Sequence, residues 1–282
     1  MKELLVTSRP LSWVNTAYPF AAAYVLAAGR IDWLMVVGTL FFLIPYNVAM
    51  YGINDVFDYE SDLLNPRKGG VEGAVVDRGR HRGILVAAIV GCVPFVVVLL
   101  SQGTAAANIF LLAALFAVVA YSAPKLRFKE RPFLDSVTSS SHFVLPAAYG
   151  LALANAHFDV GIWAFLGAYF LWGVASHAFG AVQDILPDRQ AGIGSIGTVL
   201  GARNTVLFSA AAYTAAGLLM LGTVLPWGAV LALPYLANVA PFLRVTDTGS
   251  ASANAGWRRF LVLNYVTGFL VTMLLIWYAM HR

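Results

Sequence analysis

Residues 83–101 read GILVAAIVGCVPFVVVLLS, a run without a single charged side chain. A run of this length and composition can cross the hydrocarbon core of a bilayer as a helix. The rest of the sequence has the same character, because 60% of its 282 residues are hydrophobic and only 11% are charged. A soluble domain carries nearer ~25% charged residues. The composition therefore predicts an all-α, polytopic membrane protein and leaves no room for a separate soluble domain.

Nine apolar segments of this kind predict nine transmembrane helices, which form a single integral-membrane domain over residues 1–282. All but Arg30 and Arg282 of the Lys and Arg residues fall on one side of these segments. Positive residues are retained on the cytoplasmic side, so the N-terminus is expected inside the cell membrane and the C-terminus outside. The nine segments are 12–29, 33–53, 83–101, 104–122, 133–154, 159–182, 203–223, 225–243 and 259–280.

The net charge of +4 and the single cysteine exclude several classes of partner and site. The basic residues lie in short loops beside apolar segments, where they set orientation, so no nucleic-acid partner is expected. Cys92 lies inside an apolar run, and one cysteine cannot build a disulfide framework or a cysteine-based metal site. All acidic residues except Asp32 and Asp159 fall on the predicted cytoplasmic side. The functional chemistry is therefore expected at that face.

The densest acidic group follows the second apolar segment and reads NDVFDYESD over residues 54–62. If the helix continues through it, Asp55, Asp58 and Asp62 share one face, with Asn54 beside them. Three carboxylates on one stripe repel each other and require a counter-charge. Ligands that are all oxygen favour a hard divalent cation such as Mg²⁺. The pattern predicts metal binding, with a solvated acidic helix end as the alternative.

A second acidic segment, QDILPD over residues 183–188, ends the sixth apolar segment. Asp184 and Asp188 are four residues apart and follow an amide side chain, as in the first group. Aligning the two segments shows a weak internal repeat. It predicts two pseudo-repeated four-helix units, spans one to four and five to eight, around a central cavity. Facing acidic stripes that hold Mg²⁺ can bind a diphosphate and make it a leaving group.

Two cytoplasmic segments offer positive charge for such a diphosphate. Tyr121 and Lys125, four residues apart at the end of the fourth apolar segment, are placed to donate hydrogen bonds to phosphate oxygens. Arg67 and Lys68, just beyond the first acidic group, are candidates for the same role. The glycine-rich residues 69–73 are too flexible for a span and are weak evidence of a lid.

Three motifs in this order resemble the signatures of the UbiA superfamily of intramembrane prenyltransferases: NDxxDxxxD at 54–62, YxxxK at 121–125 and DxxxD at 184–188. The resemblance covers the whole chain. It implies a helical bundle whose cavity opens sideways to lipid, Mg²⁺ as cofactor, and transfer of a prenyl group from a diphosphate to a lipophilic acceptor.

The resemblance also implies roles for individual residues. The metal site would comprise Asn54, Asp55, Asp58, Asp62, Asp184 and Asp188. The diphosphate would contact Asn54, Arg67, Lys68, Tyr121 and Lys125. The catalytic set would be Asp55, Asp58, Asp184, Asp188, Tyr121 and Lys125.

Within that superfamily, residues 44–62, 65–74 and 121–132 are most similar to the lycopene elongases of actinobacterial fifty-carbon carotenoid pathways. That similarity implies dimethylallyl diphosphate as the donor of five-carbon units, the two ends of lycopene as acceptors, and a flavuxanthin-type product. A downstream carotenoid cyclase is left open as a partner. The sequence departs from many aromatic prenyltransferases of the family at residues 65–68 and 192–195, which argues against a quinone-type acceptor.

Two other functions remain open at this stage. One is a family member that prenylates a quinone, a porphyrin or a chlorophyll precursor. The other is a cation-coupled transporter, although such a protein would usually hold its acids near the midplane of the bilayer. Release of diphosphate from dimethylallyl diphosphate in the presence of Mg²⁺ distinguishes a prenyltransferase from a cation-coupled transporter.

No side chain is an obvious general base for ending the reaction, which closes either by loss of a proton or by capture of water. His142 and His177 lie inside apolar segments, where polar groups are costly and often functional. For each of them, hydrogen-bonded packing between helices is the expected role.

Overall fold

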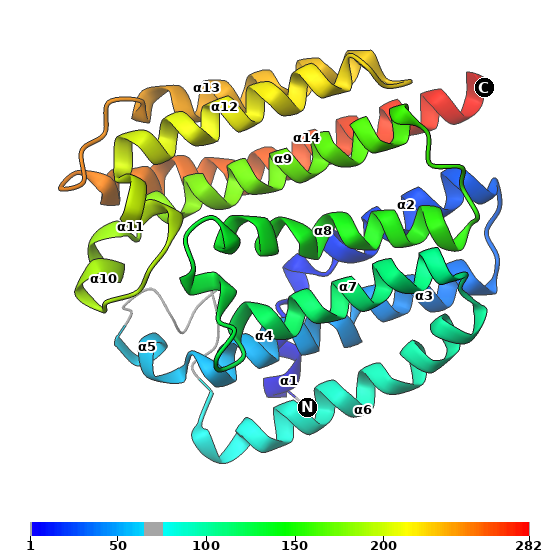
Figure 1. Cartoon of the computed structure of the whole chain (residues 1–282), viewed down its shortest axis with the longest axis horizontal. Helices are drawn as coiled ribbons and strands as arrows, with labels where there is room; N and C mark the ends of the chain where they lie inside the picture. Colours follow the sequence, from blue (N-terminus) through cyan, green and yellow to red (C-terminus); the bar gives the residue numbers. More distant parts are fainter. Residues whose placement is uncertain (1, 65–75, 282) are drawn as a thin grey trace. The chain divides into compact units, whose positions relative to one another are not determined.

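The computed structural model describes the backbone of residues 2–64 and 76–281, with the side chains of these ranges except at 2, 3, 61, 62 and 64. All regular elements in these ranges are helices, which confirms the all-α prediction (Figure 1). The chain divides into two compact units. Unit 1 comprises residues 1–128 and 141–157, and unit 2 comprises residues 129–140 and 158–282.

Unit 1 begins with a short helix and contains most of the helices of the N-terminal half. Its helices are α1 (Lys2–Thr7), α2 (Val14–Ala28), α3 (Trp33–Leu43), α4 (Pro45–Phe57), α5 (Tyr59–Leu64), α6 (Arg78–Gln102), α7 (Ala105–Ser122) and the later residues of α8 (Leu134–Leu153).

Unit 2 contains the remaining helices and takes the first residues of α8. Its other helices are α9 (Val160–Val182), α10 (Ile185–Gln190), α11 (Ile196–Leu200), α12 (Ala202–Met220), α13 (Ala232–Val239) and α14 (Asn254–His281). The predicted repeat placed all of span five in the second half, whereas α8 contributes to both units. The repeat is not confirmed and stays a prediction.

Five stretches are long and apolar enough to cross a membrane by length and composition: Trp33–Phe57, Arg78–Gln102, Ala105–Ser122, Val160–Val182 and Ser250–His281. Each covers all of one predicted span, or all of it but its first residue. The other four predicted segments are also largely helical, at α2, α8, α12 and the stretch from Pro226 to Phe242. The helical positions agree with the prediction, but the count of nine transmembrane helices stays a prediction.

Side-chain caps fix where several helices begin. Asp32 accepts a hydrogen bond from the Met35 N–H at the start of α3, at 3.1 Å. Asp159 accepts one from the Ile162 N–H at the start of α9, at 2.8 Å. Such caps satisfy backbone donors that the first turn leaves without intrahelical partners. The two acidic residues on the predicted outer side therefore have a local structural role.

Aromatic side chains fill the core of unit 1. Phe20, Phe42 and Tyr46 are fully buried, and the Phe42 ring centroid lies 5.2 Å from that of Phe20 and 5.1 Å from that of Tyr46. Gly38 on α3 lets the Phe20 ring of α2 come close, since an added Cβ would lie 2.1 Å from a ring carbon. The packing of α2 against α3 thus depends on a position without a side chain.

Hydrogen bonds between helices accompany the core of unit 2. In Figure 1, α9 and α12 run side by side, and these two helices pack extensively against each other. The Ser209 hydroxyl donates to the Ala175 carbonyl at 2.7 Å, and the Ser176 and Tyr213 hydroxyls are 3.0 Å apart. Small residues and hydroxyls at a helix interface are typical of packing between apolar helices in a membrane.

Replacing Gly38 by Ala should destabilise unit 1, because the new methyl group would collide with the buried Phe20 ring. Overpacking of this kind costs about 1–3 kcal/mol. Gly83→Ala in α6 is the matched control, since an added Cβ there meets nothing within 4 Å. Thermal unfolding in detergent micelles should show a lower midpoint for Gly38→Ala than for Gly83→Ala. Equal midpoints would contradict the packing described here.

Candidate functional site

The first acidic group lies where α4 ends. Asp55 belongs to the last turn of α4, and Asp58 is its C-cap residue, with α5 starting at Tyr59. The expectation of a continuous helix through residues 54–62 is therefore wrong. Asp55 is 1% exposed and Asp58 is 5% exposed. Burying two carboxylates so close together requires opposite charge nearby.

Arg9 supplies that charge to Asp55. Its Nη2 lies 2.8 Å from Asp55 Oδ1, and its guanidinium lies over the Tyr51 ring, 4.3 Å from the ring centroid. Arg9 has φ 50° and ψ 72°, in the left-handed region that non-glycine residues seldom adopt. This backbone turn stands directly before Pro10 and the start of α2. A strained residue is thus held in place by an ion pair across 46 residues of sequence.

The end of α7 lies beside the same group. The Ser122 hydroxyl donates to Asn54 Oδ1 at 3.0 Å, which joins α7 to α4. The loop that follows has two left-handed residues, Lys125 with φ 72° and Arg127 with φ 40°. Arg127 Nη2 lies 3.8 Å from Asp58 Oδ1. The loop after the YxxxK motif therefore brings a second arginine to the buried carboxylates.

Tyr121, the first residue of that motif, packs against a histidine of α8. The Tyr121 and His142 rings meet edge to face with centroids 5.4 Å apart. His142 Nδ1 also lies 3.4 Å from the Tyr46 hydroxyl. These contacts fix the ring of Tyr121 in the last turn of α7, close in sequence to Ser122 and its contact with Asn54.

The second acidic segment lies in unit 2, at the junction of α9 and α10. Asp184 precedes α10, and the Asp188 N–H donates to the Asp184 carbonyl at 2.8 Å, so the two carboxylates stand one helical turn apart as predicted. Asp188 Oδ2 accepts a hydrogen bond from the Ser195 hydroxyl at 3.4 Å. Gln183 accepts one from Asn254 at 2.6 Å. Neighbouring segments of unit 2 therefore hold this junction in place.

The structure thus gathers Asn54, Asp55 and Asp58 within unit 1, together with two arginines. Arg67, Lys68, the glycine-rich residues 69–73 and the side chain of Asp62 lie outside the described residues. In the part of the chain that is described, no three acidic, His or Cys side chains stand close enough to hold a metal by themselves. The ligands available at both acidic segments are oxygen atoms, which is the chemistry that Mg²⁺ prefers.

Sequence reasoning missed Arg9, Arg127 and Ser122 as members of this site. It treated both arginines as ordinary positive residues of the cytoplasmic side. Arg127 stands two residues after Lys125, so its place in the motif loop was a usable signal. Arg9 offered no local signal, because its contact with Asp55 forms only in the folded chain.

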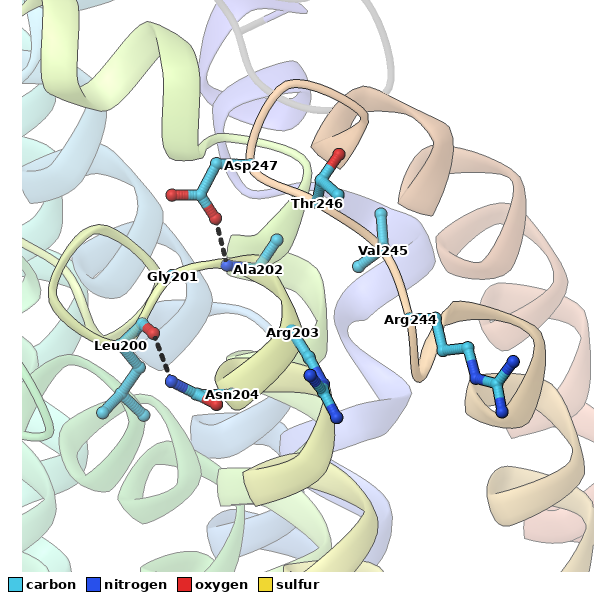
Figure 2. A pocket seen from close by; sticks show the side chains of 9 residues that line it. All are labelled: Leu200, Gly201, Ala202, Arg203, Asn204, Arg244, Val245, Thr246 and Asp247. Atoms are coloured by element: carbon cyan, nitrogen blue, oxygen red, sulfur yellow. Dashed lines mark hydrogen bonds between the residues drawn. The ribbon is translucent and has the colours of Figure 1, made fainter.

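A pocket of about 800 Å³ opens in unit 2 beside the start of α12, and it contains none of the predicted site residues (Figure 2). Figure 2 shows Asp247 accepting a hydrogen bond from the Ala202 N–H, a contact of 2.7 Å. Arg189, the neighbour of Asp188, donates to the other oxygen of Asp247 at 2.6 Å. The Ala202 N–H and the Arg189 guanidinium hold the pKa of Asp247 below its usual range. The lining residues are Leu200, Gly201, Ala202, Arg203, Asn204, Arg244, Val245, Thr246 and Asp247.

An all-helical apolar chain, with buried or partly buried acids at the ends of its helices and arginines beside them, has the features of a membrane-embedded transferase. Residues 16–264 match the model of the UbiA prenyltransferase family, and the chain belongs to that family. It is accordingly an integral membrane protein and a prenyltransferase, as the motifs predicted.

Two relatives have similar sequences over nearly the whole chain. A C(50) beta-cyclic carotenoids biosynthesis protein of Dietzia sp. (strain CQ4) is 57% identical over 281 residues, which are 98% of this chain and 65% of that protein. The chain thus spans slightly less than two thirds of that relative. A lycopene elongase/hydratase of Corynebacterium glutamicum is 50% identical over 286 residues, covering 100% of this chain and 98% of that protein.

Two solved structures share the fold. A UbiA homolog from Archaeoglobus fulgidus bound to DMAPP and Mg²⁺ gives a TM-score of 0.67 at 17% identity, over 94% of this chain and 98% of that one. The apo structure of a UbiA homolog from Aeropyrum pernix K1 gives 0.64 at 19% identity, over 92% and 98%. At this level of identity the likeness concerns the fold.

Replacing Arg9 by Met should cost about 3 kcal/mol of unfolding free energy, because it leaves the buried Asp55 carboxylate without its ion-pair partner. The double variant Arg9→Met, Asp55→Asn should recover part of that loss, since the unpaired charge is gone. Chemical unfolding of Arg9→Met, Asp55→Asn, the double variant and the parent protein in micelles measures the coupling. Strictly additive effects would show that the ion pair has no energetic weight.

The Asp247 contacts predict a pH-dependent contribution to stability. Because the pKa of Asp247 is lower in the folded protein than in the unfolded chain, its carboxylate stabilises the fold above the unfolded pKa of ~3.9. This contribution is lost as the pH falls below the unfolded pKa and through the lower pKa of the folded protein. Asp247→Asn should therefore be less stable at pH 7 and lose less stability on acidification. Parallel curves of unfolding midpoint against pH would contradict this assignment.

Proposed function

We propose that this protein transfers five-carbon prenyl groups from dimethylallyl diphosphate to the ends of lycopene, with Mg²⁺ as cofactor. The observation that carries the proposal is the pair of buried carboxylates at the end of α4, Asp55 and Asp58. Arg9, ahead of α2, and Arg127, in the loop after α7, bring positive charge to them. The Corynebacterium relative, similar over its full length, supports lycopene as the acceptor. The Archaeoglobus structure with DMAPP and Mg²⁺ supports the donor and the metal.

The acidic residues of both motifs, together with the amide of Asn54, would hold the metal. In unit 1 these are Asn54, Asp55, Asp58 and Asp62, and in unit 2 they are Asp184 and Asp188. Mg²⁺, when bound, supplies positive charge against the leaving diphosphate. Arg9 orients Asp55 through its contact with Oδ1, and Arg127 in the loop after α7 orients Asp58.

The cationic and hydroxyl side chains bind and orient the diphosphate. Tyr121, Lys125, Arg67 and Lys68 donate hydrogen bonds to its oxygens and favour its departure with the bonding electron pair. The allylic carbocation that remains is attacked by the terminal alkene of the acceptor, which forms the new carbon–carbon bond. Apolar helix surfaces exclude bulk water from the cation until this bond has formed.

The membrane arrangement belongs to the same proposal. We place nine helices across the cell membrane, with the N-terminus cytoplasmic and the C-terminus outside, because nearly all Lys and Arg residues then face the cytoplasm. Both acidic segments then open to the compartment that supplies a charged diphosphate. The lipophilic acceptor reaches the protein through the bilayer.

Asp58→Asn and Asp184→Asn should each reduce Mg²⁺-dependent diphosphate release by about 10²-fold or more, since each removes a charge that the diphosphate complex requires. Asp159→Asn is the matched control, because Asp159 caps α9 and belongs to neither motif. Release from dimethylallyl diphosphate is measured at equal protein amounts in membranes. Full activity of either motif variant would remove that residue from the metal site.

Expression in a lycopene-accumulating bacterial host tests the acceptor. Liquid chromatography with mass detection should reveal carotenoids that are heavier than lycopene by one and two five-carbon units. Unchanged lycopene, with the protein present in the membrane and active in diphosphate release, would redirect the search to aromatic acceptors. Unchanged lycopene without diphosphate release would contradict the transferase assignment of the motifs.

A further inference from the structure

A buried polar chain in unit 2 takes no part in the diphosphate chemistry described above. Asp135 in the first turn of α8 is fully buried, and its two oxygens accept the N–H of Ser136 at 2.7 Å and the N–H of Ile196 at 2.7 Å. The Ser136 hydroxyl lies 3.0 Å from His177 Nδ1 on α9. Asp135, Ser136 and His177 thus form a polar chain from α8 to the apolar helix α9. Polar groups inside such helices are costly and often functional.

The position of His177 on its helix connects this chain to the second acidic segment. His177 stands seven residues before Asp184, in the penultimate turn of α9, which ends at Val182 just ahead of the acidic segment. His177 is only partly buried, whereas Ser176 and Ala178 on either side of it are buried. The imidazole therefore lies on the apolar side of the segment that we assign to the diphosphate.

We propose that His177 is the base that directs water onto the carbocation at the end of prenyl transfer. The inference rests on the proposed function, in which attack by the acceptor alkene leaves a tertiary carbocation on the acceptor. The Corynebacterium relative is named a lycopene elongase/hydratase.

The step balances with water as the co-reactant. A lone pair of the water oxygen forms the new carbon–oxygen bond, and the positive charge passes from carbon to that oxygen. The Nε2 atom of His177 takes one proton from it, which leaves a neutral tertiary alcohol. The imidazolium then gives this proton to the released diphosphate, a base that the transfer reaction itself supplies.

The neighbours of His177 suit this role. In the tautomer with hydrogen on Nδ1, that nitrogen donates to the Ser136 hydroxyl, and the lone pair resides on Nε2. The fully buried Asp135 carboxylate accepts the Ser136 N–H and the Ile196 N–H, and so fixes the turn that holds the Ser136 hydroxyl beside His177 Nδ1. Ser136 and Asp135 are therefore positioning residues, and His177 is the residue that meets the water.

The alternative is that the chain only ties α8 to α9. A matched control exists for it, because the Ser140 hydroxyl makes a second tie between the same helices, to the Phe170 carbonyl at 2.7 Å. Ser140 stands one turn after Ser136, and its partner Phe170 lies about two turns before His177 on α9. Loss of helix packing alone should therefore affect Ser136→Ala and Ser140→Ala alike.

The experiment compares carotenoids made by His177→Gln, Ser136→Ala, Ser140→Ala and the parent protein in the lycopene-accumulating host. The measured quantity is the ratio of hydroxylated to dehydrated elongated product, with membrane protein determined for each variant. We expect the ratio to fall by about 10²-fold in His177→Gln, the usual contribution of a general base, and by less in Ser136→Ala. Ser140→Ala should keep the parent ratio. In ¹⁸O-labelled water the parent product should carry the label in its hydroxyl group.

The inference is overturned if the product ratio is unchanged in Ser136→Ala and in any His177→Gln protein that reaches the membrane. It is also overturned if Ser140→Ala changes the ratio as much as Ser136→Ala does. A product hydroxyl group without the ¹⁸O label is the third result that would overturn it. Ser136→Ala is the conservative variant that decides the matter should His177→Gln fail to reach the membrane. If the parent protein makes no elongated carotenoid, the proposed function fails and the inference fails with it. Elongation with an unaltered ratio refutes the inference alone.

Discussion

The ion pair between Arg9 and Asp55 is the constraint on which the first acidic site depends. A carboxylate moved out of water without a partner costs several kcal/mol, and in an apolar helical unit it would take up a proton instead. Arg9 reaches Asp55 at 2.8 Å and places a positive charge beside this buried carboxylate. An acid that is to bind a cation must remain ionised, so this contact precedes all of the chemistry assigned to the motif.

The need to place positive charge beside the buried carboxylates also shapes the backbone around the site. Arg9, Lys125 and Arg127 all have left-handed φ values, which non-glycine residues adopt only when the surroundings impose them. Two of the three are arginines that approach a buried carboxylate, at 2.8 Å and 3.8 Å. Local strain is therefore concentrated where charge must be brought to a fixed point. The Ser122 contact with Asn54 ties the same loop to α4 at its other end.

Much of this protein can be predicted from sequence because two signals are local. Apolar runs place helices with little ambiguity, and acids that follow such runs identify the motif segments at Asp55, Asp58, Asp184 and Asp188. The break of α4 at Asp58 was not predicted, since spacing of three and four residues fits a continuous helix equally well. Asp135 shows the same limit, because its second partner, the Ile196 N–H, lies 61 residues further along the chain.

The boundary between the two units was also beyond sequence reasoning. A repeat of spans suggests a division between helices, whereas the structure divides α8 within its own length. The early part of α8 is rich in hydroxyl groups, and Ser136 and Ser140 both bond to α9. Its later part carries His142, which contacts Tyr46 of unit 1. Side-chain chemistry along one helix, rather than hydropathy, decides to which unit each turn belongs.

The separation of Arg9 from Asp55 has a consequence for biosynthesis. Translation runs from the N-terminus, so the guanidinium already exists when Asp55 leaves the ribosome 46 residues later. The emerging carboxylate can find its counter-ion as soon as α2, α3 and α4 have been made. Arg127, in contrast, is made only after two further long helices. The order of the chain therefore neutralises Asp55, which is more deeply buried than Asp58, first, while the nascent protein is still entering the membrane.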